Sequence, residues 1–492
     1  MENFYYECIY DVLWNNHPHQ LKMTMLNRLK AKITTLHRTR LQCVMLDNVD
    51  PNRLEGEKPV LFYILQTWKW QEVRMILSVQ DEHENTQTTM NGIMRAFMTF
   101  LIRKYEPIAV EDESIERMAE IGRRNLPTAW REQLEQPIIP EEVHIAMRKG
   151  GKKKAPGSDR LVLEFYKANW ATIKDDMGEL MNQMFIERKV SPQQKHGVIV
   201  CLPKICEPTT LADFRPITLL NTDYKMMARI IVNRLRPIMA ELLQQSQFCG
   251  APSRTILEVV ATMREAIAQA EITQVPLCIL SLDFQEAFDR IYQYLFSILK
   301  NSGLSDWFID RIRGMYEGAA SSVQINGHIA GPIPIQCSVR QGRPMSMILF
   351  ALCVDPLLRI LEQKLPGIHI GKRANKTVVV AYADDVTIFV TSPTDLPVIH
   401  DAIQCYEKAT GAHLNARKLK ALAVGGWSTT TVPLGIPYAN EIKILGVTFS
   451  STIEQSTKKS WAIVTESEPR RGTLTRETYA FLSGFGMCTH TS

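Results

Sequence analysis

The spacing of apolar residues changes once along the chain, near residue 150. Over about residues 1–140, apolar positions recur every three or four residues with few β-branched runs, which predicts helices. From residue 196 onward, short apolar runs alternate with longer amphipathic segments. They predict strands at 197–202, 277–283 and 441–450 and helices at 224–243, 284–300 and 345–365. This pattern is typical of an α+β protein.

Two hairpins complete the expected sheet structure. Residues 322–336 turn at Asn326-Gly327, the strongest short hairpin signal that a sequence offers. Residues 377–390 form a second hairpin with Asp384 and Asp385 at its tip. We therefore expect an antiparallel sheet that helices cover on one face.

Composition narrows the class of protein without naming it. The 492 residues, 45% hydrophobic and 22% charged, are enough for two or three globular domains. Ten cysteines form no CxxC pair, so no closed zinc site is expected and a reducing compartment is favoured. The chain starts without a signal peptide, and its most apolar stretch, 345–358, is too short to span a bilayer. We expect an intracellular protein of the cytoplasm or nucleus that does not bind membranes.

The charge distribution says more than the net charge of +5. Residues 148–157 place five cations among glycine and proline, and such a flexible basic loop can approach phosphates closely. Residues 1–145 are also basic but contain no catalytic constellation. For any single cation there, a solvated helix face is the commoner explanation.

The most informative chemistry lies at the tip of the second hairpin. Asp384 and Asp385 repel each other between two apolar runs, and a cation would relieve that repulsion. Alone, an acidic pair at a turn is more often just solvated. However, the strand 277–283 also ends on a carboxylate, Asp283, which neighbouring strands could bring to Asp384. Such hard oxygen ligands suit Mg²⁺, and two Mg²⁺ ions can catalyse nucleotidyl transfer.

Seven segments, in the same order, resemble the reverse transcriptase domain of LINE-type (non-LTR) retrotransposons. With the two fingers motifs counted as one, they are KKAPGSD at 153–159, the fingers motifs LPK at 202–204 and FRPITLLN at 214–221, LD with AFD at 282–289, VRQG at 339–342, YADD at 382–385, G--LN--K at 411–418 and LGV at 445–447. Each is weak alone, but seven in order are very specific. The resemblance covers about residues 145–450.

The resemblance implies a right-hand polymerase fold that copies an RNA template onto a DNA primer from dNTPs. It assigns Asp283, Asp384 and Asp385 to catalysis and to two Mg²⁺ ions, with Mn²⁺ as an alternative. It assigns the nucleotide to six residues: Lys204 and Arg215 on the triphosphate, Phe288 as a steric gate against the ribose 2′-hydroxyl, Gln341 and Gly342 lining the pocket, and Lys418 as a general acid. Read without the resemblance, Phe288 is core filling and Arg215 and Lys418 are surface cations.

The chain departs from the family pattern at two single residues and over its C-terminal segment. Arg343 stands where the family usually has a cysteine, and Leu419 where it more often has a serine. Beyond about residue 466 the periodicity and the resemblance are lost, which predicts a truncated thumb. The expected divisions are a helical region at 1–145, a basic segment with pre-fingers helices at 146–195, fingers and palm at 196–450, and a partial thumb with an unrelated tail at 451–492.

Two other functions stay open at this point. An inactive retrotransposon relic would keep the fold and bind nucleic acid without synthesis, which Arg343 and the missing thumb favour. An RNA-dependent RNA polymerase also carries paired aspartates on a hairpin, although Phe288 and the order of the motifs argue against it.

Overall fold

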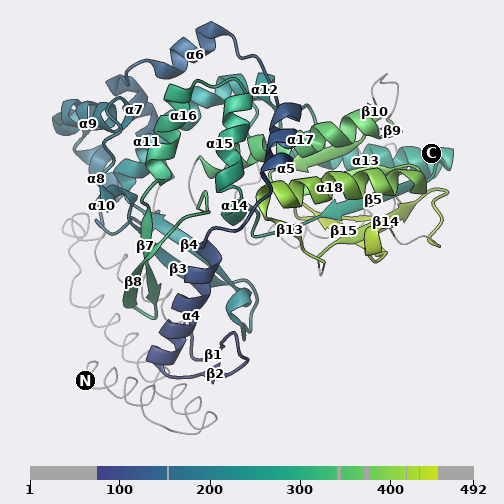
Figure 1. The fold of residues 1–492 in the computed structure, drawn as a ribbon, viewed down its shortest axis with the longest axis horizontal. Helices are drawn as coiled ribbons and strands as arrows, with labels where there is room; N and C mark the ends of the chain where they lie inside the picture. The colour runs from purple at the N-terminus through teal and green to yellow at the C-terminus, as the bar shows by residue number, and fades with distance from the viewer. Residues whose placement is uncertain are drawn as a thin grey trace, which may run out of the picture.

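The computed structural model describes residues 75–151, 154–340, 345–370, 376–416, 418–430 and 433–452. Two four-stranded sheets stand next to each other with helices around them (Figure 1). The predicted α+β class is confirmed. The predictions for residues 1–74, for the tail and for a truncated thumb lie outside the described residues. Within the described ranges, no helix is long and apolar enough to cross a membrane.

Helices dominate the segment before the first sheet, as predicted. They are α4 (Met90–Tyr105), α5 (Asp112–Ile121), α6 (Thr128–Glu135), α7 (Pro140–Arg148), α8 (Leu163–Ala168), α9 (Trp170–Phe185) and α10 (Pro192–Lys195). The first of them begins at Thr89, whose side chain accepts a hydrogen bond from the Gly92 backbone amide at 3.2 Å. A short antiparallel pair that the sequence pattern did not predict, β1 (Val79–Gln80) and β2 (Thr86–Gln87), comes before it.

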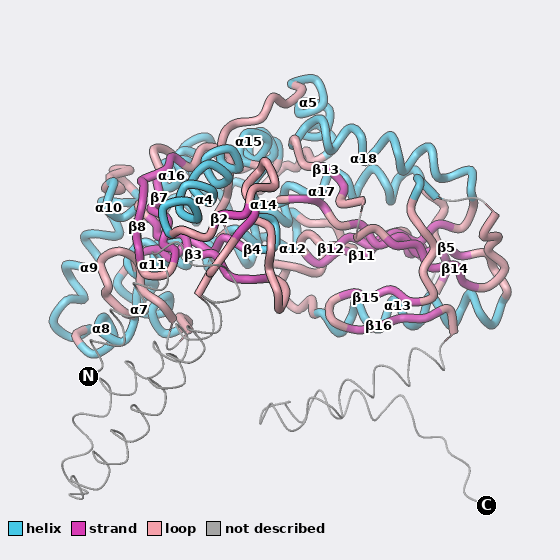
Figure 2. The backbone as a smooth tube through the Cα atoms, turned by 90° about the horizontal axis from the view of Figure 1, so that it is seen from below, coloured by secondary structure: helices cyan, strands magenta, loops and turns pink. Residues whose placement is uncertain are grey.

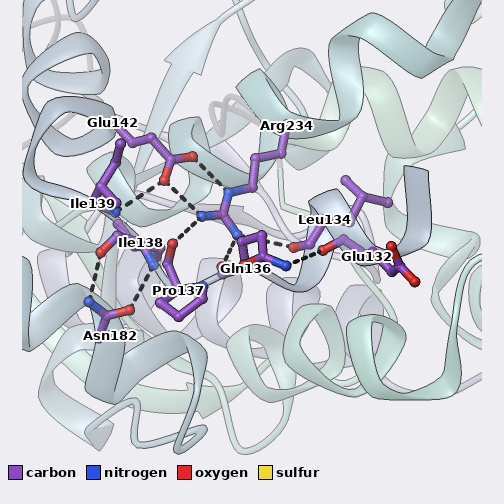
Figure 3. A network of polar contacts seen from close by, with 9 residues as sticks. All are labelled: Glu132, Leu134, Gln136, Pro137, Ile138, Ile139, Glu142, Asn182 and Arg234. Carbon is purple, nitrogen blue, oxygen red and sulfur yellow. Dashed lines mark hydrogen bonds and ion pairs between the residues drawn. The ribbon is translucent and has the colours of Figure 1, made fainter. Parts of the chain in front are cut away.

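Arg234 attaches part of this helical segment to the rest of the chain (Figure 3). It lies on α11 (Thr222–Leu235), and its Nε and Nη2 each donate to the Glu142 carboxylate at 2.7 Å. The same guanidinium donates to the carbonyl oxygen of Leu134, in the last turn of α6, and to those of Gln136 and Pro137 in the α6–α7 connection. The buried Arg234 side chain thus donates to five acceptor oxygens, all of them outside α11.

The first sheet has the order β4-β3-β7-β8 and is mixed. Strand β3 (Gly197–Pro203) pairs antiparallel with β4 (Phe214–Leu220) and parallel with β7 (Ala320–Ile325), which forms a hairpin with β8 (His328–Pro334). The turn residues of that hairpin, Asn326 and Gly327, have φ of 50° and 86°, which confirms the predicted turn. Helix α4 packs on this sheet, with the ring of Phe97 edge-on to Phe214 at 5.2 Å.

The second sheet has the order β11-β12-β5-β14, and all its pairs are antiparallel. Its strands are β5 (Leu277–Leu282), β11 (Val379–Tyr382), β12 (Asp385–Val390) and β14 (Lys420–Val424). The predicted strand at 277–283 and the hairpin at 377–390 are confirmed.

Both faces of this second sheet are covered, so the expectation of helices on one face is wrong (Figure 2). Helices α17 (Ser346–Lys364) and α18 (Leu396–Thr410) pack on one face; α13 (Ile256–Thr273) and a hairpin of β15 (Glu441–Ile444) and β16 (Val447–Ser450) pack on the other. Along β5, Leu280 and Leu282 join the first core and Leu277 and Ile279 the second. The continuous apolar run of β5 therefore marks a strand buried on both sides.

Three predicted elements are interrupted. The helix expected at 224–243 breaks after α11 into a 3₁₀ turn, η2 (Arg236–Ile238), and α12 (Met239–Leu242), because Pro237 has no amide hydrogen to donate. The helix expected at 284–300 divides into β6 (Phe284–Gln285), α14 (Ala287–Arg290) and α15 (Tyr292–Asn301). The strand expected at 441–450 is the β15–β16 hairpin, turning at Leu445 and Gly446 with φ of 50° and 85°.

The remaining described elements are short connections and one further helix. They are α16 (Asp306–Tyr316), β9 (Ile368–His369), β10 (Lys376–Thr377), β13 (His413–Leu414) and the 3₁₀ turns η1 (Leu211–Asp213), η3 (Pro393–Asp395) and η4 (Pro433–Gly435). Strand β13 matters for the site, because it pairs with β6, the short strand that begins directly after Asp283.

Candidate active site

The tip of the β11–β12 hairpin presents the acidic pair at one end of the second sheet. Tyr382 pairs with Asp385, which leaves Ala383 and Asp384 as a two-residue turn. Ala383 has φ of 55°, a left-handed conformation that residues with a Cβ adopt at some cost. A turn this tight holds both carboxylates at the sheet edge.

Asp283 arrives at the same edge on the adjacent strand. Leu282 of β5 pairs with Val386 of β12, so the register continued by one residue sets Asp283 opposite Asp385. Directly opposite residues of antiparallel strands point to the same face. The predicted meeting of Asp283 with the acidic pair is therefore supported by the register itself.

The electrostatics of the three carboxylates reflect their proximity. Burial raises the pKa of Asp384, and the negative charge of Asp283 raises it further. Burial, and then the charges of Asp384 and Asp283, raise the pKa of Asp385 to about 6. Asp384 and Asp385 are therefore harder to ionise than an ordinary aspartate, because negative charges lie close together. A cation bound between them would remove that cost.

The segment after α18 supplies partners for Asp283. The Asn415 backbone amide donates to the Asp283 carbonyl at 2.7 Å, and Asn415 Nδ2 donates to Oδ1 at 3.2 Å. Lys418 Nζ lies 3.0 Å from Oδ2 and 3.4 Å from Oδ1 of the same carboxylate. The structure thus brings Lys418 to the acidic cluster, as a partner of Asp283.

Two more predicted cations come from the first sheet, Arg215 acting on Asp384 and Lys204 acting on Lys418. Arg215 is exposed on β4, and its charge counteracts the rise in the pKa of Asp384. Lys204 follows β3, and its Nζ donates to the Ala212 carbonyl at 2.6 Å. Burial lowers the pKa of Lys204, and the charges of Lys104, Arg215 and Lys418 lower it further. Positive charges that lower one another's pKa in this way create a positive potential, which attracts a polyanion such as a triphosphate.

Phe288 lies on α14, a few residues beyond Asp283. Its half-buried ring contacts Phe350 of α17 at 4.6 Å between centroids. Its carbonyl accepts a hydrogen bond from the Val339 amide at 3.0 Å, which ties it to the segment before Arg340. The predicted pocket residues Gln341 and Gly342, and the departure at Arg343, lie outside the described residues.

Gln247 is a site residue that the sequence analysis missed. It is fully buried, and its Oε1 accepts hydrogen bonds from the amides of Ala383 at 3.2 Å and Cys249 at 3.0 Å. Its backbone also pairs with Ala381 on the edge strand β11. Gln247 thus holds the strained turn residue next to Asp384. Because 136 residues separate Gln247 from Ala383, no local pattern predicts the contact.

Comparison with known proteins decides the family. The model of the family "Reverse transcriptase (RNA-dependent DNA polymerase)" matches residues 195–449, slightly more than half of the chain. The chain belongs to the reverse transcriptase family. All the described residues of the acidic edge and of its facing cations lie within the matched range.

Curated relatives of this reverse transcriptase chain come from transposable elements. The chain is 32% identical over 326 residues to "Transposon TX1 uncharacterized 149 kDa protein" of Xenopus laevis, covering 65% of this chain and 25% of that protein. It is 23% identical over 423 residues to "Retrovirus-related Pol polyprotein from type-2 retrotransposable element R2DM" of Drosophila melanogaster, covering 82% and 38%. It is 25% identical over 328 residues to "RNA-directed DNA polymerase from mobile element jockey" of Drosophila funebris, covering 63% and 33%.

These matches confirm the predicted LINE-type retrotransposon reverse transcriptase domain. The chain spans between 25% and 38% of the lengths of the three relatives named.

Proposed function

We propose that this chain is an RNA-directed DNA polymerase that adds dNTPs to a DNA primer on an RNA template. One observation carries the proposal: the strand that ends next to Asp283 pairs with the strand that begins at Asp385, and two cations, Lys418 and Arg215, act on this acidic edge. This arrangement supports a role for the carboxylates in binding metal ions and for the cations in binding a triphosphate. The relative from mobile element jockey is named an RNA-directed DNA polymerase, and a relative from transposon BS of Drosophila melanogaster is named a probable one.

The donor set fits two Mg²⁺ ions, or Mn²⁺, held by Asp283, Asp384 and Asp385. The raised pKa values of Asp384 and Asp385 come from burial and mutual repulsion, which a divalent cation would offset. In the described part of the chain, no three His, Cys, Asp or Glu side chains form a group that could hold a metal ion by themselves. Mg²⁺ in polymerases is commonly bound by one or two carboxylates together with substrate phosphates and water. When bound, the ions would activate the attacking hydroxyl and offset charge on the leaving group.

The reaction forms one phosphoester bond and breaks one phosphoanhydride bond. The primer 3′-hydroxyl attacks the α-phosphorus of the dNTP, and pyrophosphate departs in line. Arg215 and Lys204 would hold the triphosphate, Arg215 in the bidentate geometry that a guanidinium allows. Lys418 would leave its contact with Asp283 when the nucleotide arrives and give a proton to the departing pyrophosphate.

Selection of the sugar would rest on Phe288. A ring at this position would clash with a ribose 2′-hydroxyl, so that deoxynucleotides are preferred. The contact with Phe350 limits how far the ring can retreat. Gln341 and Gly342 would line the same pocket, where glycine permits a close approach of the backbone.

We assign fingers and palm to residues 196–450. The first sheet would be the fingers, and the second sheet, with the acidic edge, the palm. Residues 1–145 would precede the polymerase as a helical region, 146–195 would form the basic segment with the pre-fingers helices, and 451–492 would be a partial thumb and tail.

The test is primer extension on an RNA template with dNTPs and Mg²⁺, comparing the purified full chain with Asp384→Asn. Loss of one metal ligand removes several kcal/mol of charge stabilisation, so extension should fall on the order of 10³-fold. Asp401→Asn, at a mostly exposed carboxylate on α18, is the matched control and should extend normally. EDTA should stop the wild type, and added Mg²⁺ or Mn²⁺ should restore it.

The same assay separates the alternatives. Template binding without extension by the wild type would favour a nucleic-acid-binding relic, which the family departure at Arg343 supports. Incorporation of rNTPs in preference to dNTPs would indicate an RNA polymerase. Extension that survives in Asp384→Asn would contradict the assignment of the acidic edge.

A further inference from the structure

Lys104 is a buried cation outside the segment that the family model matches. It lies in the last turn of α4, with its side chain only 7% exposed. Its Nζ lies 2.5 Å from Glu286 Oε1 and 2.9 Å from Asp289 Oδ2. A lysine this buried is stable as an ion only when carboxylates balance its charge. Here the balance comes from two residues 182 or more positions away in sequence.

The two carboxylates lie on either side of the gate residue. Glu286 precedes α14 and has φ of 53°, while Asp289, within α14, is 2% exposed. Phe288 lies between them, and its carbonyl accepts from the Val339 amide. The side chain of Asp289 also accepts from Ser338 Oγ at 2.6 Å. Whatever holds Glu286 and Asp289 therefore determines where the Phe288 backbone lies.

The end of α4 also contacts the segment that precedes Arg340. The Lys104 carbonyl accepts from Cys337 Sγ at 3.6 Å, and the Tyr105 carbonyl accepts from the Gln336 amide at 3.2 Å. The segment 336–340 leads into the predicted pocket residues. One helix end thus ties together the loop after Asp283 and the segment before Gln341.

We propose that Lys104 is a positioning residue that fixes the Phe288 ring and thereby sets the discrimination between deoxy- and ribonucleotides. This inference rests on the proposed function, in which Phe288 excludes the ribose 2′-hydroxyl. Without the lysine charge, the buried Asp289 carboxylate loses the cation that pairs with it, while Glu286 keeps its ion pair with Arg290. Helix α14 then shifts to bring the Asp289 carboxylate toward water, and Phe288 moves with it.

Lys104→Met tests the inference, because methionine keeps the length of the side chain and removes its charge. Arg103→Met is a matched control from the same helix turn, since Arg103 is 74% exposed and pairs with Glu82 away from the pocket. The measurement is single-nucleotide incorporation, with kcat and KM determined for a dNTP and for the matching rNTP. Phe288→Ala gives the ratio of kcat/KM for dNTP over rNTP when no ring excludes the 2′-hydroxyl.

We expect Lys104→Met to lower the ratio of kcat/KM for dNTP over rNTP by roughly ten-fold or more, since small misplacements of a positioned group cost one to two orders of magnitude. Arg103→Met should keep the wild-type ratio, and Lys104→Arg should recover most of it. A purely structural lysine would lower both nucleotides' kcat/KM equally, and that result would overturn the inference.

Two further outcomes are distinguishable. If the wild-type protein does not incorporate nucleotides, the proposed function is wrong. If Phe288→Ala leaves the ratio unchanged, Phe288 is not the gate. In either case the proposed role of Lys104 is wrong as well. If Lys104→Met does not fold, Asp289→Asn takes its place, because it leaves Lys104 intact and removes the buried carboxylate that Lys104 holds beside Phe288. A wild-type ratio in that folded variant overturns the role of Lys104 alone.

Discussion

Gln247→Met should slow catalysis while leaving nucleotide binding nearly unchanged. Methionine is close in size and flexibility to glutamine but has no oxygen to accept the amides of Ala383 and Cys249. The chemistry of the acidic residues themselves is untouched. Any effect must therefore act through the position of the turn that carries Asp384.

The magnitude follows from the hydrogen bonds lost and the strain released. Each buried amide left without an acceptor costs about 1–3 kcal/mol. The variant also removes Gln247 Nε2, a buried donor that has no hydrogen-bond partner, and this returns a similar amount for one group. The net cost is about 1–3 kcal/mol, and the turn at Ala383 can avoid it by leaving its left-handed conformation. If the whole cost falls on the transition state, kcat decreases about 10- to 100-fold.

The assay is steady-state primer extension with the dNTP and Mg²⁺ concentrations varied separately, accompanied by thermal unfolding. We expect a lower kcat, a higher Mg²⁺ requirement and a nearly constant KM for dNTP. Gln133→Met, at an exposed position of α6, is the matched control. A Gln247→Met protein with wild-type kcat and an unchanged Mg²⁺ requirement would refute the reasoning, since the turn would then hold its shape without the glutamine.

Two further predictions concern stability. Arg234→Met removes the donor that the Glu142 carboxylate and three carbonyl oxygens share, so it should destabilise the helical segment by about 2–4 kcal/mol. The variant should unfold at a lower urea concentration and be cleaved faster by proteases between α6 and α7. Unchanged cleavage there would contradict this. Lys225 has its pKa lowered to about 8 by burial and by the charge of Arg229. The folded chain therefore releases this proton at lower pH than the unfolded chain, so wild-type stability should rise relative to Lys225→Met between pH 8 and pH 10. If the Tm of the two proteins changes with pH in the same way across that range, the lowered pKa of Lys225 is excluded.

The local sequence pattern correctly predicted those strands and turns whose conformation depends on residues adjacent in the sequence. The hairpins at 322–336 and 377–390 follow from turn residues between β-forming runs, and both exist as expected. The strand ending at Asp283 follows from its apolar run. The same patterns misjudged 284–300 as one helix, since the pairing of β6 with β13 interrupts it.

The candidate site divides in the same way. The sequence by itself determined the family and the proposal that Asp283, Asp384 and Asp385 carry the chemistry, because both depend only on residue identities and on the order of the motifs along the chain. Only the tertiary structure decided what holds them. The contact of Gln247 with Ala383 and that of Lys104 with Glu286 join residues 136 and 182 positions apart. Such contacts leave no periodicity in the chain, because they depend on how separately formed elements pack and not on the spacing of side chains along any one of them.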